Sequence, residues 1–134
     1  MSKPVRIIGI DPGLRRCGWG IVDAQDNRLS FVAAGTVTPP LDGGLAERLV
    51  ALAAGLAEIL VLHRPEEAAV EETFVNAGPR SALILGQARG VALVTPAQHG
   101  LVVAEYATNL VKKSVVGTGH AEKNQVELMG RTLL

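Results

Sequence analysis

Apolar residues fall into short runs along the chain, and the first three runs predict strands. They span Val5–Ile10, Gly18–Asp23 and Leu29–Thr36. The second and third are separated only by residues 24–27, a segment with turn-forming residues. Because a parallel crossover needs a dozen residues or more, these connections are too short for one. The pattern therefore predicts an antiparallel meander of three strands.

The second part of the chain changes to helical spacing. Leucine and isoleucine recur every three or four residues between Asp42-Gly43-Gly44 and Arg64-Pro65, which predicts a long amphipathic helix. The elements expected after it are a short buried strand over Ala68–Glu72, a helix over Ser81–Thr95 stopped by Pro96, a strand over Leu101–Tyr106, and two helical stretches at about Thr108–Val116 and Glu122–Leu134.

This order of elements predicts an α/β fold. Three strands come first, and strands then alternate with helices, so a mixed sheet is expected with the meander at one edge and two parallel strands at the other. A right-handed helical crossover can carry the fourth strand past the meander to lie beside the first. The 134 residues have room for one domain, spanning 1–134, and we expect no second.

Composition narrows the class of protein. An apolar content of 48% excludes a disordered chain, and no apolar run reaches the roughly 18 residues of a membrane-spanning helix. Cys17 is the single cysteine and can form no internal disulfide, which fits a reducing compartment. We therefore expect a cytoplasmic protein without a membrane segment.

Charge is balanced over the whole chain but unevenly distributed. There are 13 basic and 13 acidic residues, and seven of the acids lie in residues 42–72 opposite only Arg48 and Arg64. Most lysines and arginines lie towards the two ends of the chain. A neutral protein can still present a basic face, so a nucleic-acid partner is permitted but not established by charge.

Two carboxylates are the strongest candidates for a functional site. Asp11 directly follows a buried strand, and Glu71 ends the fourth strand. If these strands are parallel neighbours, both carboxylates lie at one carboxyl edge, where open α/β sheets place ligands. Converging carboxylates need a shared proton or a divalent cation. Asp11 could instead cap the Pro12-Gly13 turn. Alternation allows only one of Glu71 and Glu72 to meet Asp11, and we favour Glu71 because it continues the buried run.

Weaker candidates lie in two polar segments. The glycine loop Val115–Lys123 leads into an expected helix, and Lys112, Lys113 and Lys123 near it suit phosphate contacts, although the residues alone favour a solvated charged face over such contacts. His120 in this loop is either a surface histidine or a metal or phosphate ligand. Phe74 follows the acidic pair on a polar loop, where it could stack on a base or anchor the loop.

Taken together, these segments resemble the RuvC family of Holliday junction resolvases, a branch of the ribonuclease H-like nucleases. The resemblance covers nearly the whole chain, and the matching segments keep their order and spacing. They are Gly9-Ile10-Asp11-Pro12-Gly13 with Gly18-Trp19-Gly20, Val70-Glu71 with Phe74, Ser81-Ala82-Leu83 to Gly86-Gln87-Ala88-Arg89-Gly90, and Val115-Val116-Gly117 to Ala121-Glu122-Lys123.

The resemblance implies a fold, an activity and site residues. The fold would be a ribonuclease H-like five-stranded mixed sheet flanked by helices. The activity would be Mg²⁺-dependent nicking, with Mn²⁺ as a substitute, of opposing strands of four-way DNA by a homodimer that works with a branch-migration helicase. The implied residues are Asp11 and Glu71 as metal ligands, Lys123 as a catalytic cation, and Phe74, Arg80, Lys112, His120 and Lys123 as DNA contacts.

One departure from the family pattern affects the expected activity. The family carries a further acidic pair, or a histidine and an aspartate, on a last helix beyond the position of Leu134. We therefore expect an incomplete metal site and impaired catalysis in the 134-residue chain, with the final helix missing. Two alternatives follow: a non-catalytic module that binds junction DNA, and a fragment of an actin-like or sugar-kinase-like ATPase, whose family also begins with a strand, an aspartate and a glycine hairpin.

A stripe of small residues suggests how the protein assembles. Ala82, Gly86 and Gly90 recur at four-residue steps along the second expected helix. Glycine inside a helix costs about 1 kcal/mol relative to alanine, so the stripe indicates close backbone approach there. The surface approached is either the domain's own sheet or the same helix of a second copy, and the resemblance favours a two-fold dimer.

Overall fold

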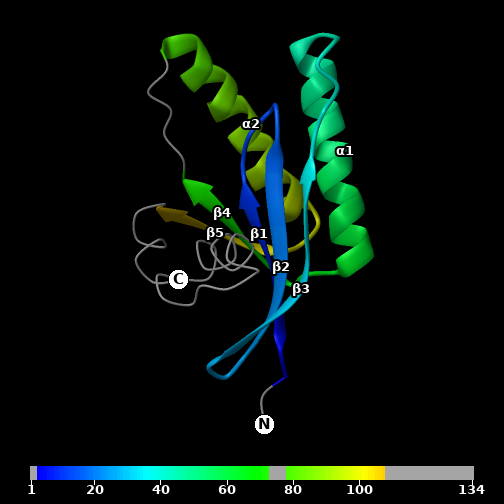
Figure 1. Cartoon of the computed structure of the whole chain (residues 1–134), viewed down its shortest axis with the longest axis vertical. Coiled ribbons are helices and arrows are strands. Elements are labelled where there is room, and N and C mark those ends of the chain that lie inside the picture. Colours follow the sequence, from blue (N-terminus) through cyan, green and yellow to red (C-terminus); the bar gives the residue numbers. More distant parts are fainter. Residues whose placement is uncertain (1–2, 73–77, 108–134) are drawn as a thin grey trace.

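The computed structural model describes residues 3–72 and 78–107, which form a mixed sheet with two long helices (Figure 1). The elements are β1 (Val5–Asp11), β2 (Cys17–Gln25), β3 (Arg28–Val37), α1 (Leu45–His63), β4 (Glu67–Glu72), α2 (Pro79–Gln98) and β5 (Val102–Ala107). Neither helix is long and apolar enough to cross a membrane, within the residues searched.

The sheet has the predicted topology. Its five strands lie in the order β3-β2-β1-β4-β5. The pairs β1–β2 and β2–β3 are antiparallel, whereas β1–β4 and β4–β5 are parallel. The meander and the crossover of β4 to the side of β1 are therefore confirmed, as is the α/β class. The two helical stretches expected over 108–116 and 122–134 lie outside the described residues.

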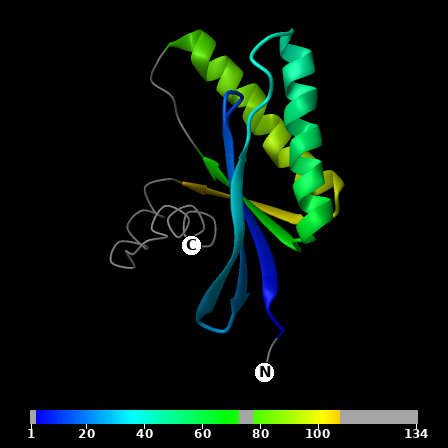
Figure 2. The ribbon, with the colours of Figure 1, turned by 45° about the vertical axis from the view of Figure 1, so that its right-hand side comes forward.

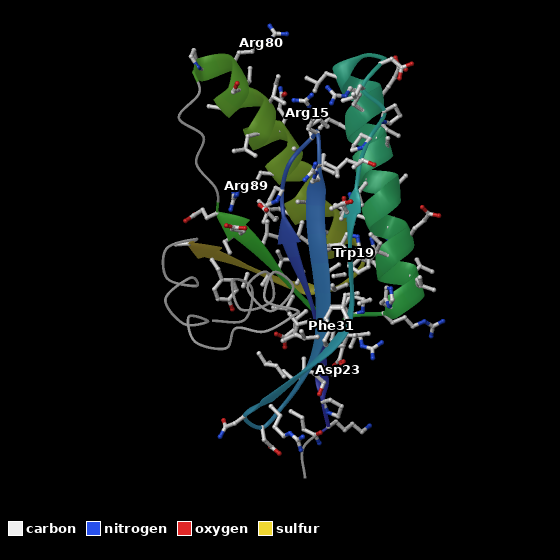
Figure 3. All side chains as sticks on the ribbon, viewed as in Figure 1. Arg15, Trp19, Asp23, Phe31, Arg80 and Arg89 are labelled. Atoms are coloured by element: carbon white, nitrogen blue, oxygen red, sulfur yellow. The ribbon has the colours of Figure 1, made fainter. Side chains whose placement is uncertain are left out.

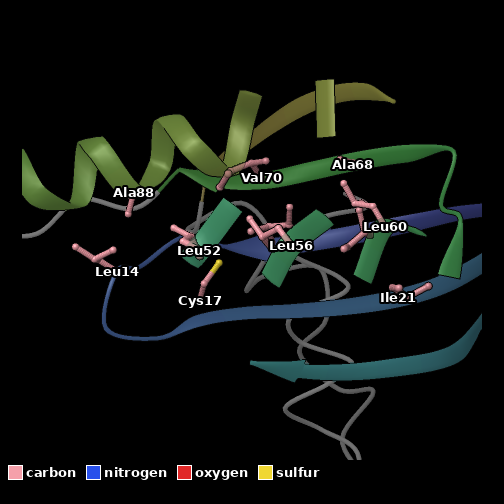
Figure 4. Packing of buried hydrophobic residues seen from close by; sticks show 12 residues of the cluster. Leu14, Cys17, Ile21, Leu52, Leu56, Leu60, Ala68, Val70 and Ala88 are labelled. Atoms are coloured by element: carbon pink, nitrogen blue, oxygen red, sulfur yellow. The ribbon is translucent and has the colours of Figure 1, made fainter. Parts of the chain in front are cut away.

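One face of the sheet and both helices enclose the core. Leu52, Leu56 and Leu60 of α1 are almost fully buried and pack with Val70 of β4 (Figure 4), in a cluster that also includes Ile8 of β1. The leucines recur at four-residue steps, which places them on one side of the helix. Ala88 and Ala92 of α2 belong to the same cluster, so α1 and α2 cover the same face. In Figure 2 the carboxyl-terminal part of α2 lies beside α1.

The predicted carboxyl-terminal end of α2 is wrong. Pro96 was expected to stop this helix, but it lies inside the last turn and the helix continues to Gln98. Its ring is fully buried, and its carbonyl accepts hydrogen bonds from the backbone N–H groups of His99 and Leu101, both at 3.1 Å. A proline this close to a helix end removes few intrahelical bonds, and burial of its ring offsets that loss.

The amino-terminal end of β1 is fixed by Arg6. Its guanidinium donates from Nε and Nη2 to the two carboxylate oxygens of Asp23 on β2, each at 2.9 Å, and from Nη1 to the carbonyl of His63 at the end of α1 at 3.0 Å. This pairing raises the pKa of Arg6 and lowers the pKa of Asp23, in both cases chiefly through the side-chain hydrogen bond. One side chain thus connects two strands and a helix at the end of the sheet away from Asp11.

Candidate active site

The two candidate carboxylates end neighbouring parallel strands. β1 and β4 pair from Ile7 opposite Glu67 to Ile10 opposite Val70. One further step in the same register places Asp11, the last residue of β1, opposite Glu71 of β4. The carboxyl edge of the sheet therefore brings these two residues together, as the sequence predicted.

Alternation along the strands shows which face they share. Ile10 and Val70 belong to the core beneath the helices. The next residues, Asp11 and Glu71, consequently lie on the opposite face, and Glu72 returns to the helix side. Glu71 is almost fully buried, with 3% of its surface exposed, whereas Asp11 is partly exposed. The choice of Glu71 over Glu72 as the partner of Asp11 follows from this register.

Neighbouring strands add two residues to this edge. Gly18 of β2 is the register partner of Asp11, and a Cβ built on Gly18 would lie 3.8 Å from the Cβ of Asp11. The missing side chain thus leaves room beside the aspartate. On the other flank, Tyr106 of β5 is the register partner of Glu71 and is partly buried. The sequence analysis did not name Tyr106 as a site residue. The signal that could have found it was its position near the end of a strand expected to run parallel to that of Glu71.

The loop after Asp11 is a tight turn that requires glycine. A Cβ on Gly13 would lie 2.3 Å from the carbonyl oxygen of Arg16, which is too close for any other residue. Leu14 is buried within the loop, while Arg15 and Arg16 are exposed. The turn therefore holds two cations directly after the carboxylate.

Cys17 follows this loop as the first residue of β2, and its thiol is unreactive. It is fully buried, and burial raises the pKa of its thiol to about 12. A backbone hydrogen bond from Gly13 opposes that rise, and the negative charge of Asp11 adds to it. A neutral buried thiol is a poor nucleophile, so the structure gives Cys17 no catalytic role.

The donor set suits a hard divalent cation. Carboxylate oxygens are the ligands that Mg²⁺ and Mn²⁺ prefer, and Asp11 and Glu71 supply them from two rigid strands. Within the ranges 3–72 and 78–107 no three acidic, histidine or cysteine side chains gather closely enough to hold an ion by themselves. Further ligands must therefore come from water, from DNA or from residues outside these ranges.

The predicted DNA contacts fall into two groups. Phe74, Lys112, His120 and Lys123 lie outside the described residues. Arg80 lies within the described residues and is exposed in the first turn of α2, where Figure 3 labels it.

The small-residue stripe of α2 faces away from the domain. Ala82, Gly86 and Gly90 are exposed, and a Cβ added at either glycine would meet nothing within 4 Å. The side of α2 that packs on the sheet is instead the one with Ala88 and Ala92. Packing against the domain's own sheet therefore does not explain the two glycines.

Comparison with known proteins places the chain among nucleases. A family model described as crossover junction endodeoxyribonuclease RuvC matches residues 7–134. The chain is 61% identical over 134 residues to the protein of that name from Rhodopseudomonas palustris, covering 100% of this chain and 77% of the relative. It is 62% identical over 130 residues to that of Azorhizobium caulinodans, covering 97% of this chain and 77% of the relative.

Solved structures agree with this placement. The structure described as Thermus thermophilus RuvC in complex with Holliday junction substrate superposes with a TM-score of 0.77 at 32% identity, covering 93% of this chain and 76% of that one. A mitochondrial Holliday junction resolvase of yeast has a TM-score of 0.62 at 9% identity, covering 96% of this chain and 77% of that one, and shows likeness of fold alone.

Proposed function

The chain belongs to the RuvC family of crossover junction endodeoxyribonucleases, and from this membership and the site geometry we infer that it nicks four-way DNA junctions in recombination and repair, using a divalent cation held by Asp11 and Glu71. The observation that supports the assignment of the site is the register that sets these two carboxylates on the same face of adjacent parallel strands. Family membership favours this function over an ATPase fragment.

The residues of the site have separate tasks. Asp11 and Glu71 hold the cation at a fixed place, because both sit on hydrogen-bonded strands in the middle of the sheet. Gly18 leaves the space beside Asp11 open for a phosphate oxygen or a water. The bound cation, which we propose to be Mg²⁺ with Mn²⁺ as a substitute, would supply charge stabilisation and a more acidic water for phosphodiester hydrolysis.

The DNA contacts outside the described residues complete the proposal. Phe74 would stack on a base at the junction centre, and Lys112, His120 and Lys123 would contact phosphates, with Lys123 also offsetting charge that develops on the scissile phosphate. These roles rest on the family resemblance. The cytoplasmic location and a branch-migration helicase as partner rest on it too.

A homodimer is the proposed active form. The exposed stripe of α2 is flanked by Leu83 and Val94, which are 63% and 47% exposed, so one helix face offers both small and apolar residues. Paired nicks need paired sites, and an isologous contact through this face would supply them.

The test separates metal binding, DNA binding and cleavage. Asp11→Asn and Glu71→Gln remove a charged ligand without adding bulk, so both variants should bind a labelled four-way junction as tightly as wild type and lose nicking by at least a hundredfold. Thermal unfolding gives a readout besides activity: Mg²⁺ at ten times its dissociation constant stabilises the wild type by about 1.4 kcal/mol and should leave either variant unchanged.

Two outcomes would contradict the proposed function. Cleavage by Asp11→Asn at the wild-type rate would refute the metal site. Junction binding by the wild type with neither nicking nor thermal stabilisation in Mg²⁺ or Mn²⁺ would favour the alternative of a binding module.

A further inference from the structure

Tyr106 stands beside one of the two candidate metal ligands and has no role in the proposed function. It lies on β5 and is the register partner of Glu71 on the neighbouring strand β4. Adjacent strands lie about 4.8 Å apart, so the two side chains leave the backbone at roughly that separation. In Figure 1 the arrowheads of β4 and β5 point to the same side of the sheet, as expected for a parallel pair.

The residue before Tyr106 shows which face of the sheet the tyrosine occupies. Glu105 forms a salt bridge with Arg89 of α2 and therefore faces the helices. Side chains alternate along a strand, so Tyr106 faces away from the helices. That is the face shared by Asp11 and Glu71. Tyr106, Glu71 and Asp11 consequently stand in one row across β5, β4 and β1.

The salt bridge with Arg89 also fixes the end of β5. This strand lies at the edge of the described sheet and pairs with β4 alone. Nη2 of Arg89 donates to Oε1 of Glu105, and the arginine side chain is only 20% exposed. A partly buried ion pair is screened less than an exposed one. β5 is thus held by the ladder on one side and by α2 from above, and Tyr106 is presented from a fixed strand.

The Tyr106 side chain has the length needed to reach a ligand of the carboxylates. The ring is partly buried, and the hydrogen bonds between described residues do not involve its hydroxyl. A tyrosine side chain extends beyond a neighbouring glutamate by about 2 Å, roughly the length of one Mg–O contact. The hydroxyl can therefore meet an oxygen atom of a group that is bound in front of Glu71.

A phosphate oxygen suits this donor. The phenol O–H is a neutral donor, and the non-bridging oxygens of a phosphodiester carry negative charge, which makes such a hydrogen bond stronger than a neutral one. Every nucleotide offers these oxygens, so the contact requires no particular base. Negative charge grows on them during hydrolysis, so a donor already in place stabilises the transition state more than the bound substrate.

We propose that the hydroxyl of Tyr106 donates a hydrogen bond to a non-bridging oxygen of the scissile phosphate, which makes Tyr106 a further catalytic residue. This inference rests on the proposed function, because it takes the scissile phosphate to lie at Asp11 and Glu71. The hydroxyl acts on the rate of nicking, and the affinity for the junction does not depend on it.

The first test removes only the hydroxyl. Tyr106→Phe keeps the ring, and a hydrogen bond to a charged group corresponds to about a ten- to hundredfold change in rate, so single-turnover nicking should slow by that factor. The dissociation constant of the junction should stay the same. Thr36→Val is the matched control: Thr36 is exposed in the same row, opposite Gly18 on β3, about 10 Å from Asp11. This variant should nick at the wild-type rate.

Sulfur substitution separates a hydrogen bond from packing of the ring. The junction carries a phosphorothioate of defined stereochemistry at the mapped nick, and nicking is measured in Mn²⁺. Sulfur is a weak acceptor, so Tyr106→Phe should lose most of its effect on the diastereomer in which sulfur replaces the bonded oxygen. The full effect should remain on the other diastereomer. A residue that only packs would give the same effect on both.

A further measurement detects the contact without cleavage. Tyr106 is the only tyrosine of the chain, so biosynthetic incorporation of fluorotyrosine labels this position alone and gives one fluorine resonance in the NMR spectrum. The resonance should shift when a four-way junction saturates the labelled protein in Ca²⁺, which replaces Mg²⁺ to prevent nicking.

The outcomes separate this inference from the proposed function. Nicking by Tyr106→Phe at the wild-type rate, equal effects on the two diastereomers, or an unshifted fluorine resonance would each overturn the role of Tyr106 and leave junction cleavage intact. A wild-type chain that neither prefers nor nicks junctions would instead overturn the proposed function.

Discussion

Gly55 provides a direct test of how α1 is held against the sheet. It lies in the middle of α1, and a Cβ added there would approach the Cγ1 of Val37, at the end of β3, to 2.6 Å and its Cγ2 to 3.3 Å. In an exposed helix interior, Gly→Ala stabilises by about 1 kcal/mol. Here the added methyl also overpacks the helix–strand contact, which costs about 1 to 3 kcal/mol.

The two effects can be weighed from the position of Val37. Its two methyl groups occupy two of three staggered positions, so rotation about χ1 removes the closest contact only by moving a methyl elsewhere in a packed interface. We expect the steric cost to exceed the helix gain, so that Gly55→Ala lowers the free energy of unfolding by about 1 kcal/mol.

Urea denaturation measures this effect through Trp19, the single tryptophan, which packs against the core. In a Val37→Ala background the clash is absent, and Gly55→Ala should then stabilise by about 1 kcal/mol. The two substitutions should therefore be strongly non-additive. Stabilisation by Gly55→Ala in the wild-type background would refute the close packing of α1 on the end of β3.

Three further predictions follow from the described contacts. Gly86→Leu should shift the protein from dimer to monomer in sedimentation while it stays folded; a wild type that is monomeric at high concentration would contradict the dimer. Because Arg6 lowers the pKa of Asp23, that pair stabilises the fold above the ordinary carboxyl pKa of about 3.9 and loses this effect as pH falls through the folded value. Asp23→Asn should therefore weaken the dependence of the free energy of unfolding on pH in the acidic range, measured by urea denaturation. An unchanged dependence would show that the Arg6–Asp23 pair does not contribute to it. Cys17 should resist maleimide at pH 7 until urea unfolds the chain, since its pKa is about 12; rapid labelling of the folded protein would contradict its burial.

The sheet could be predicted from the sequence because local rules restrict its topology. Short connections force the meander, and a helical crossover of fixed hand carries β4 to the free side of β1. The end of α2 could not be predicted this way. Pro96 is a strong stop signal in isolation, and only burial of its ring in the folded domain outweighs that signal. Element boundaries that depend on tertiary packing are therefore the part that sequence patterns miss.

Asp11 and Glu71 share one end of the fold with four arginines, Arg15, Arg16, Arg48 and Arg80. The carboxylates and the arginines differ in how far their positions could be predicted from the sequence. Asp11 and Glu71 were predictable because each closes a buried strand, and parallel neighbours end at one edge. The arginines are up to 65 residues apart in the chain, and each is unremarkable in its local sequence. They meet because a crossover helix runs antiparallel to the strands that it connects, so helix starts and strand ends share one end of the fold. The same geometry that brings Asp11 and Glu71 to one edge of the sheet therefore also brings Arg48 to the loop of Arg15, where the two side chains line one cavity.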